Sequence, residues 1–80
     1  MTDTILRLPA VKTNTGLSRS TIYLRVAQGE FPKPVSLGGR AVGWPASEVA
    51  ALNAARIAGK SNSEIRELVV ALEAARKTVA

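Results

Sequence analysis

Residues 15–23 read Thr-Gly-Leu-Ser-Arg-Ser-Thr-Ile-Tyr, and this stretch decides how the first half of the chain folds. Gly16 can adopt a positive φ and turn the chain sharply. Ser18 is a favourable N-cap, because its hydroxyl accepts hydrogen bonds from backbone N–H groups in the following turn. These residues predict a helix over residues 19–28, and Gly29 is a natural stop for it.

Another helix is predicted immediately before this turn. Residues 5–8 are a short apolar run, which is either a strand or the lead into a helix. Pro9 suits the first turn of a helix, where its missing N–H costs nothing, so we expect a helix from Pro9 to about Asn14. Two helices of about two turns each, joined by a tight turn that contains glycine, form a helix-turn-helix.

A β-hairpin is predicted after the helix-turn-helix. The prolines of the run Phe31-Pro32-Lys33-Pro34 forbid a helix and give an extended connector. Residues 35–44 then place Gly38-Gly39 between two short β-prone runs, a strong signal for a two-residue turn. Arg40 would lie at the tip of this hairpin, which is typical of the wing of a winged helix. The turn predicts two cross-strand pairs on one face, Val35 with Val42 and Leu37 with Arg40.

A third helix is predicted to begin at Pro45 and to run to about Ala58. Its larger buried side chains are expected to be Val49, Leu52 and Ile57. Phe31 and Trp44 flank prolines at element boundaries, and a domain this small needs its bulky groups in the core. The predicted fold class is therefore mainly α with a small β-hairpin, a winged helix-turn-helix over residues 1–58.

Residues 59–80 are predicted to add a C-terminal amphipathic helix. Ser61 and Glu64 fit a capping box, so this helix should run from about Asn62 to Lys77. Its large apolar residues recur at helical spacing, at Ile65, Leu68, Val69, Leu72 and Val79. One interpretation is self-association of two chains through Ile65, Leu68, Val69 and Leu72. The alternatives are packing against its own domain, and cooperative binding along DNA without a fixed dimer.

Positive charge is concentrated in the first half of the chain. Eleven Lys and Arg residues outweigh six Asp and Glu residues, for a formal net charge of +5. Residues 1–45 hold six basic and two acidic side chains, a net of +4, and residues 46–80 hold five and four, a net of +1. Basic charge on a small domain points first to nucleic acid, so we expect the first half to bind it.

The composition excludes several classes of function. The chain has no Cys and no His, which removes disulfides, thiol chemistry, zinc fingers and histidine acid–base catalysis. Eighty residues leave little material for an enclosed catalytic cleft. No apolar run approaches the ~18 residues of a membrane span, and the N-terminus lacks the features of a signal peptide. We therefore expect a cytoplasmic, nucleoid-associated binding module, not an enzyme, with no cofactor, metal, membrane partner or small-molecule ligand.

The order of these motifs resembles the AlpA family of small prophage-associated transcriptional regulators, which are related in fold to phage excisionases and MerR-type DNA-binding domains. The resemblance covers roughly residues 5–58 and is specific as an ordered set. It implies a winged helix-turn-helix that binds DNA and regulates prophage or integrative-element genes, often including integrase; some members act as excisionases. The segments that carry it are Thr15 to Tyr23, Gly29 to Val35, Leu37 to Arg40, Val42 to Trp44, and Glu48-Val49.

Two features depart from the family pattern. The family often has a basic residue directly after the tyrosine and an apolar one next, whereas the order here is Leu24-Arg25. The pattern therefore does not fix how this part of the helix faces. The C-terminal helix is also longer than in a minimal family member, and the resemblance does not explain it.

The helix that begins at Arg19 is the candidate recognition helix, whose N-terminal residues would enter the major groove. Its candidate DNA contacts are Ser18, Arg19, Ser20, Thr21, Tyr23 and Leu24. In the wing, glycines let the backbone approach DNA, and arginine enters the minor groove or binds a phosphate. These wing candidates are Gly38, Gly39 and Arg40. Candidate phosphate contacts are Lys12, Arg25 and Lys33, for which a purely solvated role is the alternative.

Two classes of function follow. The first is a sequence-specific regulator that binds double-stranded DNA of a mobile element and controls transcription, integrase expression included, or acts as an excisionase. It would bind as a monomer, a homodimer or a cooperative oligomer. The second is a protein-interaction adaptor whose C-terminal helix binds a partner, with the basic half only solubilising the chain. An adaptor should expose its largest apolar patch on that last helix.

Overall fold

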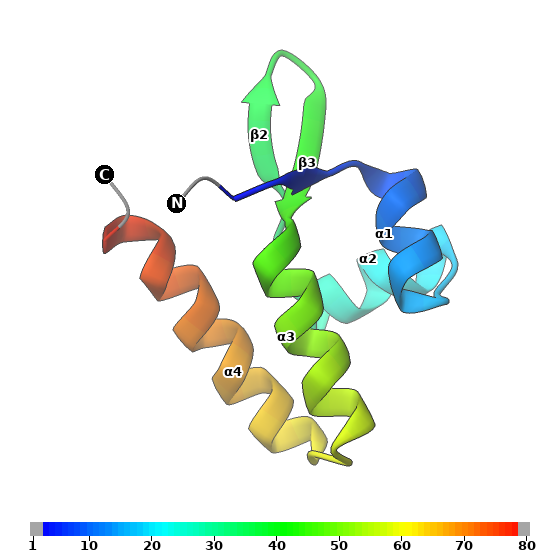
Figure 1. The fold of residues 1–80 in the computed structure, drawn as a ribbon, viewed down its shortest axis with the longest axis vertical. Coiled ribbons are helices and arrows are strands. Elements are labelled where there is room, and N and C mark those ends of the chain that lie inside the picture. Colours follow the sequence, from blue (N-terminus) through cyan, green and yellow to red (C-terminus); the bar gives the residue numbers. More distant parts are fainter. Residues whose placement is uncertain (1–2, 79–80) are drawn as a thin grey trace.

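The computed structural model describes residues 3–78 and shows a winged helix-turn-helix followed by an additional C-terminal helix (Figure 1). The predicted fold class, mainly α with a small hairpin, is confirmed. The predicted apolar position Val79 lies outside the described residues. The elements in chain order are β1 (Ile5–Leu6), α1 (Leu8–Thr15), α2 (Arg19–Ala27), β2 (Val35–Gly38), β3 (Ala41–Pro45), α3 (Ala46–Ile57), α4 (Asn62–Ala75) and the 3₁₀ turn η1 (Arg76–Thr78).

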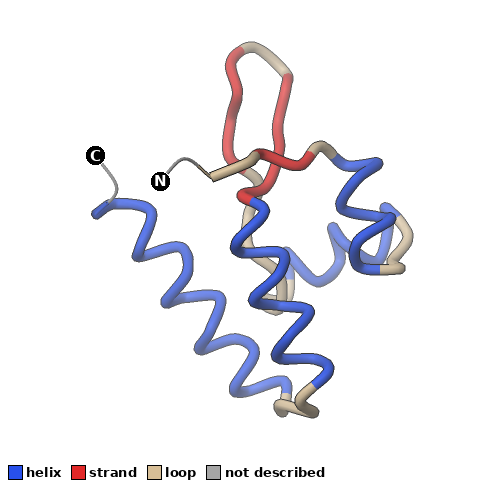
Figure 2. The backbone as a smooth tube through the Cα atoms, in the orientation of Figure 1, coloured by secondary structure: helices blue, strands red, loops and turns tan. Residues whose placement is uncertain are grey.

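The helix-turn-helix forms where the glycine and serine signals place it. Gly16 has φ 73° and donates its N–H to the carbonyl oxygen of Lys12 at 2.8 Å, which ends α1. The Ser18 hydroxyl accepts from the N–H of Thr21 at 3.3 Å and starts α2 at the predicted residue. Figure 2 shows α1 and α2 joined by this short loop.

The sheet has three antiparallel strands in the order β1-β3-β2. Residues 5–8 therefore form both of the predicted alternatives. The first two residues form the strand β1, and Leu8 begins α1. Gly43 makes the pairing of β1 with β3 feasible. A Cβ at this position would lie 2.5 Å from the Ile5 Cγ2 atom and 2.9 Å from the Leu6 carbonyl oxygen. Only glycine lets the two strands approach this closely.

The hairpin register differs from the prediction. Val35 lies opposite Gly43 and Ser36 opposite Val42, and a bulge follows before Gly38 pairs with Ala41. The predicted pairs Val35–Val42 and Leu37–Arg40 are therefore wrong. The physical reason is that Gly38, with φ 102°, ends β2, so the turn moves on to Gly39 and Arg40. Two adjacent glycines permit either turn position, and the bulge absorbs the extra residue.

The hydrophobic core lies where all four helices of the described chain meet the base of the hairpin. Trp44 is fully buried, and its indole N–H donates to the Pro32 carbonyl oxygen at 2.8 Å. The Phe31 ring meets it edge-on with centroids 6.1 Å apart, so both aromatics are core residues as predicted. The buried apolar residues are Val11, Ile22, Phe31, Trp44, Val49, Leu52, Ile65 and Val69.

The third helix, α3, has Pro45 as its N-cap residue and ends at Ile57, within a residue of the prediction. Val49 and Leu52 are buried as expected, but Ile57 is 87% exposed, so the prediction that it is buried is wrong. Ile57 follows Leu52 by five positions, which at 100° per residue turns it about 140° away. The prediction rested on the apolar character of Ile57, whereas the helical spacing alone places its side chain outside the core.

The fourth helix, α4, lies antiparallel beside α3 and packs on the chain's own core (Figure 1). The predicted capping box is present. Ser61 Oγ accepts from the Glu64 N–H at 3.2 Å, and Glu64 Oε1 accepts from the Ser61 N–H at 3.1 Å. Regular helix ends at Ala75, two residues before the predicted Lys77, and η1 follows. The four self-association candidates all face this core, Ile65 and Val69 buried, and Leu68 and Leu72 half-buried against it.

Candidate nucleic-acid interface

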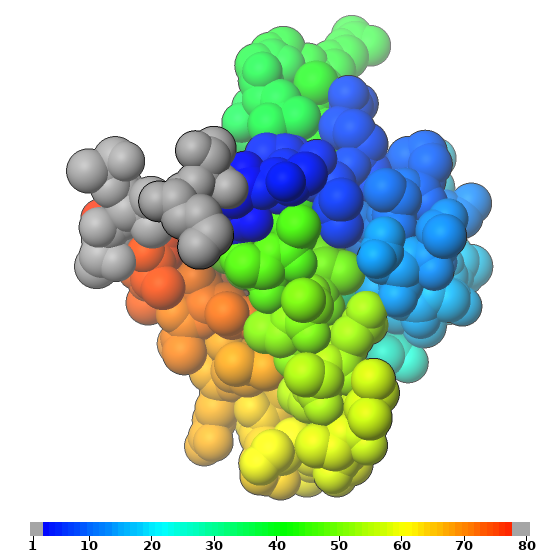
Figure 3. Space-filling view, in the orientation of Figure 1, coloured from blue at the N-terminus to red at the C-terminus, as the bar shows by residue number. Residues whose placement is uncertain are grey.

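We call α2 the recognition helix and β2, β3 and the turn between them the wing. Figure 3 shows the wing projecting beyond the body formed by the helices. Its tip carries Gly38, Gly39 and Arg40, all exposed, as the sequence predicts for a hairpin tip. Both glycines have positive φ, 102° and 56°, a conformation that glycine adopts readily. Because glycine has no side chain, nothing at either position holds a ligand's surface away from the backbone.

The start of the recognition helix presents a cluster of hydroxyl groups. Ser18 Oγ accepts from the Thr21 N–H, donates to Thr21 Oγ1 at 2.9 Å and lies 3.3 Å from Ser20 Oγ. Ser18 and Ser20 are exposed, and Thr21 is half-buried. Each hydroxyl retains a lone pair or a proton for a further partner. The helix therefore begins with groups that can donate to phosphates or accept from base edges.

Tyr23 connects the recognition helix to the wing. Its ring meets the Trp44 ring of β3 edge-on, with centroids 6.1 Å apart at 62°. On its other side, the Arg19 guanidinium carbon lies 5.7 Å from the Tyr23 centroid, a cation–π contact. Tyr23 is 37% exposed, so the ring packs while part of it remains at the surface. These contacts link Arg19 to the base of the wing through Tyr23.

Leu24 is 56% exposed on the recognition helix and has no core role. Arg25, the next residue, is half-buried and lines a pocket with Glu30 and Arg56, against α3. The reversed order Leu24-Arg25 thus leaves the apolar residue exposed and puts the cation toward the body. Of the two, Leu24 is the one exposed together with Ser20.

The remaining candidate phosphate contacts, Lys12 and Lys33, are both exposed. Lys12 lies in the last turn of α1. The main chain of Lys33 is held from α4 and η1. Its N–H donates to Glu73 Oε2 at 2.9 Å, and its carbonyl oxygen accepts from Arg76 Nη2 at 2.8 Å. Sequence reasoning did not find this clamp, because no local spacing connects residues about forty positions apart.

Arg76 also forms a two-bond ion pair with Glu48, which is only 5% exposed. Hydrogen bonding to the Glu48 carboxylate raises the pKa of Arg76 above its ordinary value, and burial opposes this. The Arg76 guanidinium therefore stays protonated at every pH below that ordinary value. It attaches the end of α4 to the first turn of α3 and, through Lys33, to the connector that leads into the wing.

Within residues 3–78, ion pairs engage four of the five cations of the second half, all but the exposed Lys77, and none of those of the first half. Glu30 pairs with Arg66 at 2.8 Å and with Arg56 at 3.8 Å, and Lys60–Glu64 and Arg76–Glu48 complete the set. All four paired cations lie in residues 56–76. None of the six basic residues of the first half is paired with a carboxylate within residues 3–78. These six are Arg7, Lys12, Arg19, Arg25, Lys33 and Arg40.

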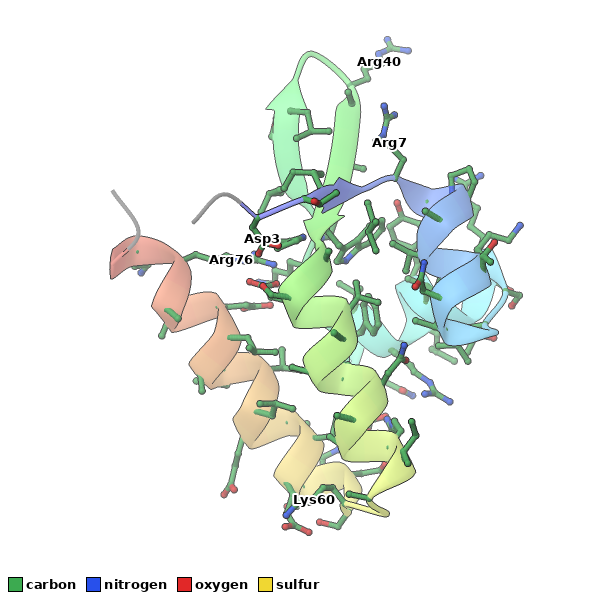
Figure 4. The ribbon with its side chains drawn as sticks, viewed as in Figure 1. Asp3, Arg7, Arg40, Lys60 and Arg76 are labelled. Atoms are coloured by element: carbon green, nitrogen blue, oxygen red, sulfur yellow. The ribbon has the colours of Figure 1, made fainter. Side chains whose placement is uncertain are left out.

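Arg7 is a member of this group that sequence reasoning did not single out. It is exposed, and its Nε donates to the Val42 carbonyl oxygen of β3 at 2.9 Å. Figure 4 shows Arg7 and Arg40 pointing to the same side of the wing, whereas Lys60 lies at the opposite end of the molecule. No local sequence pattern marks Arg7, because the strand that positions it is only two residues long and is defined by its pairing with β3.

Within residues 3–78 the structure shows no group of three or more metal-ligating side chains and no helix that is long and apolar enough to span a membrane. The arrangement instead offers a helix rich in hydroxyl groups and a hairpin tip, both associated with unpaired cations.

Comparison with known proteins agrees with this geometry. Over 58 residues, 72% of this chain, the sequence is 55% identical to an uncharacterized protein, ORF88, of Enterobacteria phage P4, and the match spans 66% of that protein's length. Over 51 residues, 56% of this chain, it is 43% identical to the DNA-binding transcriptional activator AlpA of Escherichia coli strain K12, covering 73% of that protein. Residues 4–57, which run from just before β1 to the end of α3, match the family described as prophage CP4-57 regulatory protein (AlpA). The chain therefore belongs to the AlpA family of prophage regulatory proteins.

Proposed function

We propose that this chain is a sequence-specific regulator that binds double-stranded DNA of a prophage or integrative element and acts without catalysis. The observation that carries the proposal is the division of its cations. Those of α3 and α4 are neutralised by carboxylates, while those of the helix-turn-helix and wing are not. Unpaired cations attract the phosphate backbone, and this attraction supplies a large share of the affinity of such proteins for DNA.

In the proposed complex, α2 lies in the major groove. Arg19 is held by Tyr23 and can pair with the O6 and N7 atoms of a guanine. Exposed Leu24 can contact a thymine methyl group. Arg40 at the wing tip enters the adjacent minor groove or binds a phosphate, as the two tip glycines permit.

The C-terminal helix has a supporting role in this proposal. Residues 1–58 bind DNA, while α4 and Arg76 complete the core and hold the connector before the wing. The adaptor hypothesis is less favoured, because the exposed large apolar residues among residues 3–78 are spread over several elements and do not gather on α4. They are Ile5, Tyr23, Leu24, Leu37, Ile57 and Val70.

Titration with duplex DNA at several salt concentrations tests the proposal. Arg19→Ala and Arg40→Ala should each weaken binding by about tenfold or more, because each removes a charge-assisted hydrogen bond to DNA. Lys60→Ala is the matched control, since it removes a cation that is paired with Glu64 and distant from the wing. Equal affinity of all four proteins would exclude this interface.

Sequence specificity and biological role need DNA from the protein's own locus. We expect tighter binding to one fragment of that locus than to unrelated duplexes, and changed transcription from an integrase promoter when the protein is present. Uniform affinity for every fragment would exclude a sequence-specific regulator. Sedimentation of the protein on a bound fragment separates a monomer from a homodimer or a cooperative array.

A further inference from the structure

Arg7 is positioned by the sheet and not by a helix. Pairing of Leu6 with Trp44 brings β1 across β3, and Gly43 provides the space for that crossing. Arg7 is the next residue and precedes α1 as its N-cap residue. The side chain therefore starts from a fixed point at the base of the wing.

The guanidinium is then oriented by one hydrogen bond. Arg7 Nε donates to the Val42 carbonyl oxygen at 2.9 Å, which holds the group against the wing. Within residues 3–78 no carboxylate pairs with it, and its two terminal nitrogens donate to no protein acceptor, so both face solvent or a ligand. A planar guanidinium whose orientation is fixed and whose remaining donors are unused suits bidentate binding of a phosphate.

Arg40 reinforces this assignment. It extends from the wing tip on the same side as Arg7 in Figure 4, so the wing carries one cation at its tip and one at its base. DNA that contacts the tip on that side would bring its phosphate backbone toward the base as well.

We propose that Arg7 binds a DNA phosphate and forms, together with Arg40, a two-point grip on the backbone beside the wing. This inference rests on the proposed function, because it needs DNA at the wing. It adds a contact from the β1–α1 junction to the expected contacts of the recognition helix and the wing tip.

The experiment measures the dissociation constant of the full chain for a mixed-sequence duplex over a series of salt concentrations. Arg7→Gln should weaken binding about tenfold at low salt. It should also reduce the slope of log affinity against log salt by about 0.9, which corresponds to one phosphate contact. Arg7→Lys keeps the charge but loses the planar fork, so it should keep the slope and bind with intermediate affinity. Lys60→Gln should leave both quantities unchanged.

The outcomes separate the two proposals. If the unaltered chain binds the duplex and Arg7→Gln shows the same salt slope, Arg7 has only a structural role and this inference is overturned while the proposed function stands. If the unaltered chain binds no duplex, both are overturned. Should Arg7→Gln fail to fold, as a thermal scan would show, Arg7→Lys carries the test: binding as strong as that of the unaltered chain would overturn the bidentate contact.

Discussion

Gly43 lies in the wing strand β3, where β1 crosses it, and the close pairing of these two strands requires a residue without a side chain. A methyl group there would lie within 3.0 Å of both Ile5 and the Leu6 carbonyl oxygen, and one of these atoms is backbone and cannot rotate away. Gly43→Ala should therefore lower the free energy of unfolding by about 1–3 kcal/mol, the usual cost of overpacking. Thermal or urea unfolding measures it, with Ser63→Ala at the exposed start of α4 as the control. An unchanged midpoint would contradict the close crossing of β1 and β3.

Leu52 and Ile57 test how well spacing predicts burial. Both are large apolar residues of α3, but Leu52 is 3% exposed and Ile57 is 87% exposed. Leu52→Ala should cost about 2–5 kcal/mol of unfolding free energy, because it leaves a cavity. Ile57→Ala should stay within about 0.5 kcal/mol, as is usual for surface changes. Urea titrations of both variants check this, and a large loss at Ile57 would show that the side chain is covered.

At the scale of elements, the end of α4 is attached through Arg76 to two other segments, the first turn of α3 and the connector at Lys33. Arg76→Ala leaves the buried Glu48 carboxylate without its cation, so it should cost about 3–5 kcal/mol. Lys60→Ala removes an exposed pair and should cost less than about 1 kcal/mol. Urea unfolding of the two variants compares these losses. Equal small losses would mean that the Glu48–Arg76 pair does not hold α4.

The elements also show what the sequence could predict. Helix limits followed from local signals, since Gly16, Ser18 and the Ser61–Glu64 capping box act within one turn of themselves. The hairpin register did not follow, because two adjacent glycines allow two turn positions and only the packed sheet selects one. Most of the candidate DNA contacts came from the same local motifs. Arg7 was missed because its placement depends on a crossing between residues nearly forty positions apart.

At the scale of the whole molecule, the division of charge limits how steeply DNA binding can depend on salt. Six cations of the first half have no carboxylate partner within residues 3–78, and each phosphate contact contributes about 0.9 to the slope. If the phosphate contacts of one chain come from these six cations alone, the slope should be no steeper than about −5. Arg25 is half-buried and turned toward α3, so the fold favours fewer phosphate contacts and a shallower slope.

The paired cations should contribute little to the salt dependence. Arg56→Gln should therefore leave the slope unchanged, whereas Arg19→Gln should make it shallower. Fluorescence titrations over a salt series measure these slopes, and a slope much steeper than −5 would mean that two or more chains bind DNA as one unit.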